Sequence, residues 1–67
     1  MVNRSFIVFE SSKGRKDLVF VTSDLATALN SASTWHADTG WTYRVYSVDD
    51  SFAFYVDKLT PIAVYAK

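Results

Sequence analysis

Two short apolar runs, separated by a polar loop, occupy the first third of the chain. Residues 6–9 and 18–21 are rich in β-branched and aromatic side chains, which favour strands. The loop at residues 11–16 contains Gly14, which can adopt the positive φ of a tight turn. We therefore predict an antiparallel hairpin whose two strands are apolar on both faces.

A helical spacing of apolar residues follows the second run. These residues are Leu25, Ala28, Leu29, Ala32 and then Trp35 or His36. Ser23 is the best candidate for the N-cap, and Asp24 is well placed for the helix dipole. Gly40 is expected to end the helix, because it can adopt the left-handed conformation common after helix C-termini. The pattern predicts one amphipathic helix of about three turns, with small alanines that let it lie close to a sheet.

The last third of the chain alternates between apolar and polar residues. This alternation predicts three strands, over residues 41–48, 52–56 and 62–66. Pro61 lacks a backbone N–H and therefore suits the start of an edge strand. The order is ββαβββ and the fold class is α+β: an antiparallel sheet of four to five strands with one helix packed on one face. Residues 1–67 are expected to form one small domain.

One short helix covers only one face of such a sheet. The residues expected beneath it are Phe6, Val8, Phe20, Tyr43, Val45, Phe52, Phe54, Ile62 and Val64. The opposite face then carries some of Ile7, Phe9, Val19, Val21, Tyr46, Tyr55 and Tyr65. An apolar patch that includes tyrosines is typical of a binding surface. Alternatively, sheet curvature and neighbouring side chains cover most of this patch.

The leading hypothesis for function is therefore a non-catalytic protein-binding module. Such a module docks an aromatic sheet face on a partner or adds its edge strand to one. Its size suits a small inhibitor or accessory factor of the kind that phages encode. The candidate interface residues are Phe9, Arg44, Tyr46, Tyr55 and Tyr65. A homodimer through the same face would supply the core that a short chain lacks, and a structural subunit of a larger assembly is a further alternative.

The charge of the chain is balanced, with seven basic and seven acidic residues. This balance argues against general nucleic-acid binding, which usually accompanies a basic excess. Lys13, Arg15 and Lys16 nevertheless form a basic loop tip. Together with exposed tyrosines, they would bind single-stranded nucleic acid by stacking and phosphate contacts. We rank this alternative below protein binding, because a solvated hairpin loop explains the same residues.

Side chains suited to catalysis are few. The chain has no cysteine, which removes thiolate metal sites and cysteine nucleophiles. Its single histidine, His36, is expected at the helix C-terminus, where a protonated imidazole favours the dipole. Asp49 and Asp50 are explained by a turn, and no nucleophile-elbow, HExxH or glycine-rich phosphate pattern occurs. We therefore expect no enzymatic activity, no metal and no cofactor.

Apolar runs in the sequence are short, and none approaches the ~20 residues that a membrane-spanning helix needs. The N-terminal residues also lack the apolar stretch and cleavage site of a signal peptide. The sequence therefore predicts a cytoplasmic protein with no membrane segment. The absence of cysteine is compatible with a reducing compartment.

Overall fold

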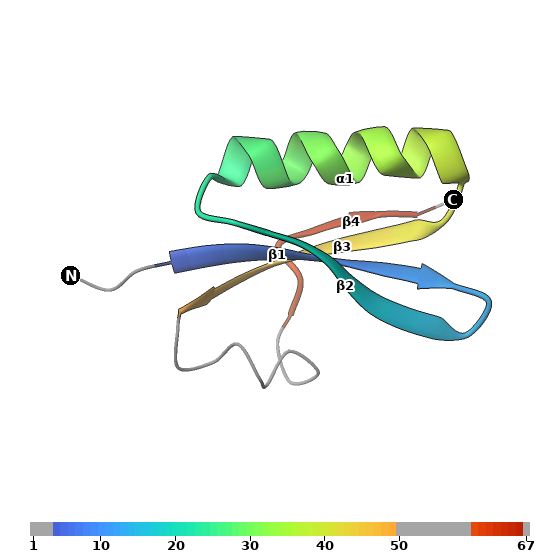
Figure 1. Ribbon diagram of the computed structural model, residues 1–67, viewed down its shortest axis with the longest axis horizontal. Coiled ribbons are helices and arrows are strands. Elements are labelled where there is room, and N and C mark those ends of the chain that lie inside the picture. Colours follow the sequence, from blue (N-terminus) through green and yellow to red (C-terminus); the bar gives the residue numbers. More distant parts are fainter. Residues whose placement is uncertain (1–3, 50–59, 67) are drawn as a thin grey trace.

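The apolar runs near the N-terminus form the predicted hairpin. The computed structural model describes residues 4–49 and 60–66. Strand β1 (Arg4–Ser12) pairs antiparallel with β2 (Arg15–Thr22), as Figure 1 shows. The two connecting residues, Lys13 and Gly14, have φ values of 54° and 81°. Positive φ at both central positions matches the twist of a hairpin, so the prediction for Gly14 is confirmed and Lys13 shares its conformation.

The remaining described strands complete a four-stranded antiparallel sheet in the order β2-β1-β3-β4. Strand β3 (Thr42–Asp49) pairs with β1, and the short β4 (Ala63–Tyr65) pairs with β3. Among the described strands, β4 lies at the edge of the sheet, as predicted for the strand that follows Pro61. The predicted α+β class with an antiparallel sheet and one helix is also confirmed, in the order ββαββ. The strand predicted over residues 52–56 lies outside the described residues.

The helix α1 (Leu25–Thr39) has 15 residues, which make about four turns rather than the predicted three. Its N-cap is Asp24, whose backbone is extended and whose carboxylate accepts a hydrogen bond from the Thr27 N–H at 3.1 Å. The prediction of Ser23 as the N-cap is wrong by one residue, because Asp24 supplies the acceptor at the correct spacing. The helix ends at Gly40, with φ 75° and its N–H donating to the His36 carbonyl at 2.8 Å, as predicted.

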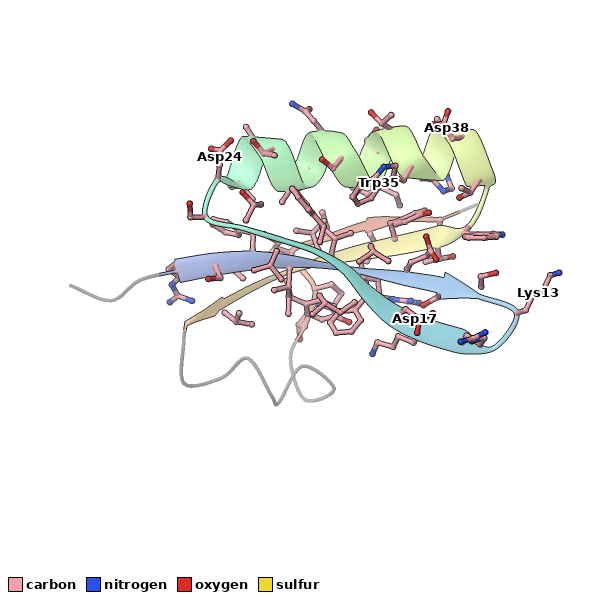
Figure 2. All side chains as sticks on the ribbon, in the orientation of Figure 1. Lys13, Asp17, Asp24, Trp35 and Asp38 are labelled. Carbon is pink, nitrogen blue, oxygen red and sulfur yellow. The ribbon has the colours of Figure 1, made fainter. Side chains whose placement is uncertain are left out.

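The main core lies between α1 and the face of the sheet that the helix covers (Figure 1). Ala28 and Ala32 are fully buried, so the helix backbone approaches the strands closely. Trp35 projects toward the sheet in Figure 2, and its ring meets the Phe20 ring edge-on at a centroid distance of 5.6 Å. The predicted packing of five strand residues beneath the helix is confirmed: Phe6, Val8, Phe20, Tyr43 and Val45.

The face assignment of the last strand is wrong. Ile62 and Val64, predicted beneath the helix, are 50% and 51% exposed. Tyr65, predicted on the opposite face, packs against the helix-side core. The reason is the register with β3, because Tyr65 lies opposite Tyr43 and cross-strand partners share a face. Phe52 and Phe54, also predicted beneath the helix, lie outside the described residues.

Candidate binding surfaces

The helix-free face of the sheet brings together three of the five predicted interface residues. Phe9 lies opposite Arg44 in the β1–β3 register, and Tyr46 lies two residues further along β3. Because alternate residues of a strand share a face, Phe9, Arg44 and Tyr46 occupy one surface. Tyr65 lies on the helix side, and Tyr55 lies outside the described residues.

The centre of the helix-free face is packed rather than open. Tyr46 is only 3% exposed, and it forms a small buried cluster with Ile7 and Val48. The Phe9 ring meets the Tyr46 ring edge-on at a centroid distance of 5.7 Å. The Lys16 ammonium lies 5.4 Å from the Phe9 ring centroid and 6.0 Å from that of Tyr46. The expectation of Tyr46 as an exposed ring is therefore wrong, although its predicted face is correct.

Exposed apolar side chains lie instead along the two edges of this face. Leu18 and Val21 on β2 are 52% and 54% exposed. In the β1–β2 register they lie opposite Phe9 and Ile7, which places both on the helix-free face. The exposed Val64 of β4 lies opposite Arg44 and shares this face as well.

Strand β2 is the longer of the two edge strands formed by the described residues, and it is irregular at its centre. Val8 lies opposite Phe20 and Phe9 lies opposite Leu18, so Val19 is an extra residue that forms a bulge. Three charged residues precede this bulge at the hairpin end of β2, whereas residues 18–22 carry no charge. The two halves of the same edge therefore differ in their protection against strand addition.

The predicted basic loop tip is divided between the two faces of the hairpin. Lys16 lies opposite Ser11 and reaches the aromatic rings of the helix-free face. Arg15 lies opposite Ser12, on the face that carries the helix. Figure 2 shows Lys13 at the outer end of the hairpin, pointing away from the sheet. The three basic residues therefore do not form one patch, and Lys16 is separated from Lys13 and Arg15 by the sheet.

An open pocket of about 320 Å³ lies over the hairpin end of the helix-side face. We call it the Trp41 pocket, and its lining residues are Glu10, Ser12, Lys13, Arg15, Asp17 and Trp41. Sequence reasoning missed Glu10, Asp17 and Trp41 as candidates. The signal that would have found the first two is the two-residue turn, because it fixes a register in which Glu10 lies directly opposite Asp17.

Hydrogen bonds connect the pocket to the end of the helix. The Tyr43 hydroxyl donates to Glu10 Oε2 at 2.8 Å and lies 3.2 Å from the Thr39 hydroxyl. Thr39 in turn donates to the Trp35 carbonyl at 3.0 Å and accepts from the Trp41 N–H at 3.1 Å. Burial raises the pKa of the Tyr43 phenol above its ordinary value, and the Thr39 hydrogen bond opposes this shift. One chain of hydroxyl groups thus holds both the Glu10 carboxylate and the Trp41 backbone in place.

His36 has a structural position at this helix end. Its Nδ1 lies 2.7 Å from the Trp41 carbonyl oxygen. Since a carbonyl only accepts hydrogen bonds, Nδ1 is the protonated nitrogen in this contact. The contact fixes Trp41 from its carbonyl side, while Thr39 fixes it from its N–H side.

Groups of metal-ligating side chains are absent from residues 4–49 and 60–66: no three or more His, Cys, Asp or Glu gather there. Within the same ranges, no helix has the length and apolar character that crossing a bilayer requires. Comparison of the chain with protein-family models, curated proteins and solved structures finds no significant match.

Proposed function

We propose that this chain is a non-catalytic protein-binding module that adds an extended segment of a partner protein to the uncharged half of the β2 edge. The observation that carries the proposal is the exposure of Leu18 and Val21, each more than half exposed, on a strand at the edge of the sheet. An edge strand presents unpaired backbone N–H and C=O groups to any strand that lies beside it. Strand addition uses these groups for affinity and the alternating side chains for specificity.

The distribution of charge along β2 selects the docking segment. Natural edge strands are protected by charged side chains, lysine above all, and by bulges. Arg15, Lys16 and Asp17 provide that protection at the hairpin end, and the bulge at Val19 interrupts the strand. Residues 18–22 carry no charge, so protection by charged side chains stops at Leu18, and beyond the bulge the strand pairs regularly with β1 from Phe20 to Thr22.

The apolar side chains of the docking segment indicate the kind of partner strand that would bind there. Leu18 and Val21 lie on the helix-free face, so the neighbouring side chains of an added strand are expected to be apolar there. Burying the exposed half of each side chain contributes about 1 kcal/mol, which adds to the new strand pairing. A partner segment of β-branched or aromatic residues fits this surface best.

The proposal is tested with a matched pair of substitutions, Val21→Lys and Leu25→Lys. Leu25 is also exposed, at 40%, but it lies at the start of α1 and outside the β2 edge. Partners captured from host extract by the unsubstituted chain are identified and purified, and their affinity for each variant is measured by calorimetry. We expect Val21→Lys to weaken binding at least about tenfold, because it places a charge in an apolar contact. We expect Leu25→Lys to bind with unchanged affinity.

Two further measurements test the apolar nature of the contact and the identity of the partner. The affinity should persist at raised salt, because apolar contacts are not screened. Sedimentation at micromolar concentration distinguishes a second copy of this chain from a different partner. A captured partner that binds Val21→Lys as tightly as the unsubstituted chain would contradict docking at β2.

A further inference from the structure

We propose that the Trp41 pocket binds a single nucleotide whose base carries amino and ring N–H donors, with guanine preferred. This site is independent of the β2 docking segment, and it uses the opposite face of the hairpin. The base would stack on Trp41, its N–H groups would donate to Glu10 and Asp17, and its phosphate would contact Lys13 and Arg15. The pocket therefore offers a complementary group to each part of one nucleotide.

The carboxylates of Glu10 and Asp17 form the acceptor side of the site. The two residues lie directly opposite each other on adjacent strands, an arrangement that is unfavourable for like charges. The Tyr43 hydroxyl donates a hydrogen bond to Oε2 of Glu10. Oε1 of Glu10 and the Asp17 oxygens are therefore the acceptors that a ligand would use. Ionised carboxylates only accept hydrogen bonds, and they select a ligand edge that donates.

Trp41 provides the stacking surface. Its side chain is 41% exposed at the rim of the pocket, while its backbone is held on both sides by Thr39 and His36. A fixed backbone lowers the entropy lost when a ring stacks on the indole. Stacking on aromatic side chains is the general mode by which proteins hold unpaired bases.

Lys13 and Arg15 provide the phosphate contacts at the outer rim. Both line the pocket, and Figure 2 shows Lys13 at the end of the hairpin, away from the sheet. Two cations and two carboxylates leave the lining with no net charge. A neutral lining disfavours a long polyanionic strand, but it suits one nucleotide, which carries both donors and a phosphate. The volume of about 320 Å³ lies at the lower end of the range for small-molecule sites.

The donor pattern of the bases predicts their order of affinity. Guanine presents an amino group beside a ring N–H, and both can donate to the paired carboxylates. Adenine and cytosine present one amino group each. Uracil presents a single ring N–H between two carbonyl oxygens. The carboxylates repel these carbonyl oxygens, because both groups only accept hydrogen bonds. Guanosine monophosphate is therefore expected to bind more tightly than uridine monophosphate.

The first experiment is a titration followed by nuclear magnetic resonance. Guanosine and uridine monophosphates are added to the full chain, and the indole N–H signals of Trp35 and Trp41 are assigned with Trp41→Phe. We expect saturable shifts of the Trp41 indole and of the Glu10 and Asp17 amides, with little change at Trp35, which packs in the core. Guanosine monophosphate should bind at least about fivefold more tightly than uridine monophosphate, because loss of a bidentate hydrogen-bond pair weakens binding by at least this factor. Absence of saturable shifts with every nucleotide would overturn the proposal.

Two adjacent basic residues give a matched control, because they lie on opposite faces of β2. Arg15→Ala should weaken guanosine monophosphate binding about fivefold, since it removes one exposed phosphate contact. Lys16→Ala should leave the affinity unchanged, because Lys16 contacts the rings of the helix-free face. Trp41→Ala should weaken binding about tenfold through the loss of stacking. Equal weakening by Arg15→Ala and Lys16→Ala would refute the assigned site.

The source of the nucleotide is resolved by comparing guanosine monophosphate with a short guanine-containing single strand. Equal affinities identify the free nucleotide as the ligand, and an oligonucleotide that binds about tenfold more tightly identifies a single-stranded nucleic acid. Val21→Lys should retain nucleotide binding in either case. This variant therefore separates a failure of the pocket proposal from a failure of the docking proposal.

Discussion

The two faces of the sheet are alike at their centres and different at their edges. Val45 and Tyr43 are buried beneath the helix, and Val48 and Tyr46, from the same strand, are buried on the helix-free face. At the edges of the helix side, the flanking residues pack against the core: Phe20, Ala63 and Tyr65. At the edges of the helix-free face, the corresponding residues are about half exposed: Leu18, Val21 and Val64. The burial of a central strand thus says little about the surface that its neighbours present.

The two faces also differ in how they satisfy a buried tyrosine. The Tyr43 hydroxyl donates to Glu10 and lies beside Thr39, so it belongs to a network between sheet and helix. The Tyr46 hydroxyl has no hydrogen bond within the described residues, and its ring is held by Phe9 and Lys16. The helix-side tyrosine is therefore held by a polar network as well as by packing, whereas the described contacts of Tyr46 are with the Phe9 ring and the Lys16 ammonium.

The largest expected effects come from matched Val→Ala substitutions across the two faces. Val45→Ala and Val48→Ala should each lower the free energy of unfolding by about 2 kcal/mol, because each removes buried methyl groups and leaves a cavity. Val21→Ala and Val64→Ala should each change it by less than about 0.5 kcal/mol, because their side chains are half exposed. Urea unfolding monitored by circular dichroism measures these differences. A negligible effect at Val48 would show that the centre of the helix-free face is not packed as described.

A pair of Tyr→Phe substitutions tests the polar difference between the faces. Tyr43→Phe should lower the free energy of unfolding by about 1 kcal/mol, because it removes the hydroxyl between Glu10 and Thr39. Tyr46→Phe should change it by less than about 0.5 kcal/mol, since it removes no described hydrogen bond. The same urea titrations provide the measurement. Equal costs at the two positions would contradict the assigned network.

The dependence of stability on alkaline pH tests the burial of Tyr43 on the helix side of the sheet. The folded-state pKa of Tyr43 is raised above 10.0, chiefly by burial. A raised pKa means that the protonated phenol stabilises the fold below pH 10, and that this contribution is lost as the pH rises through the folded-state value. Thermal unfolding between pH 8 and 11 should therefore show a steeper loss for the unsubstituted chain than for Tyr43→Phe, a range chosen to bracket the pKa of about 10 for tyrosine. Parallel profiles would indicate that Tyr43 titrates normally.

The smallest effect on stability is expected at Asp24, the N-cap of α1. Asp24 accepts hydrogen bonds from the Thr27 hydroxyl and, to a lesser extent, the Thr27 backbone N–H, and these lower the pKa of its carboxyl below 3.8. Asp24→Ala should slightly lower the melting temperature, and Asp24→Asn should preserve most of it, since asparagine retains an acceptor. The advantage of aspartate over asparagine is present above pH 3.8 and is lost as the pH falls through the lowered folded-state value. An advantage that persists at pH 2 would contradict this origin.

The candidate sites were only partly predictable from local patterns. Phe9, Arg44 and Tyr46 share a face. Strand alternation places residues 44 and 46 together, and the register of β1 with β3 adds Phe9. Their exposure was not predictable, since it depends on ring packing between strands that are far apart in the sequence. Glu10 and Trp41 were missed for a similar reason. They meet because the helix returns the chain to the hairpin end, a contact that no local pattern contains.

Local patterns along the chain predict the order and type of the described elements. Strand alternation, helical spacing and the stop at Gly40 are properties of neighbouring residues, and they predict local structure without reference to the rest of the chain. Tertiary structure alone decided which face each strand presents, as the reversed placement of Val64 and Tyr65 shows. The physical reason is that alternation has two equivalent phases, and only the pairing register with a neighbouring strand selects between them.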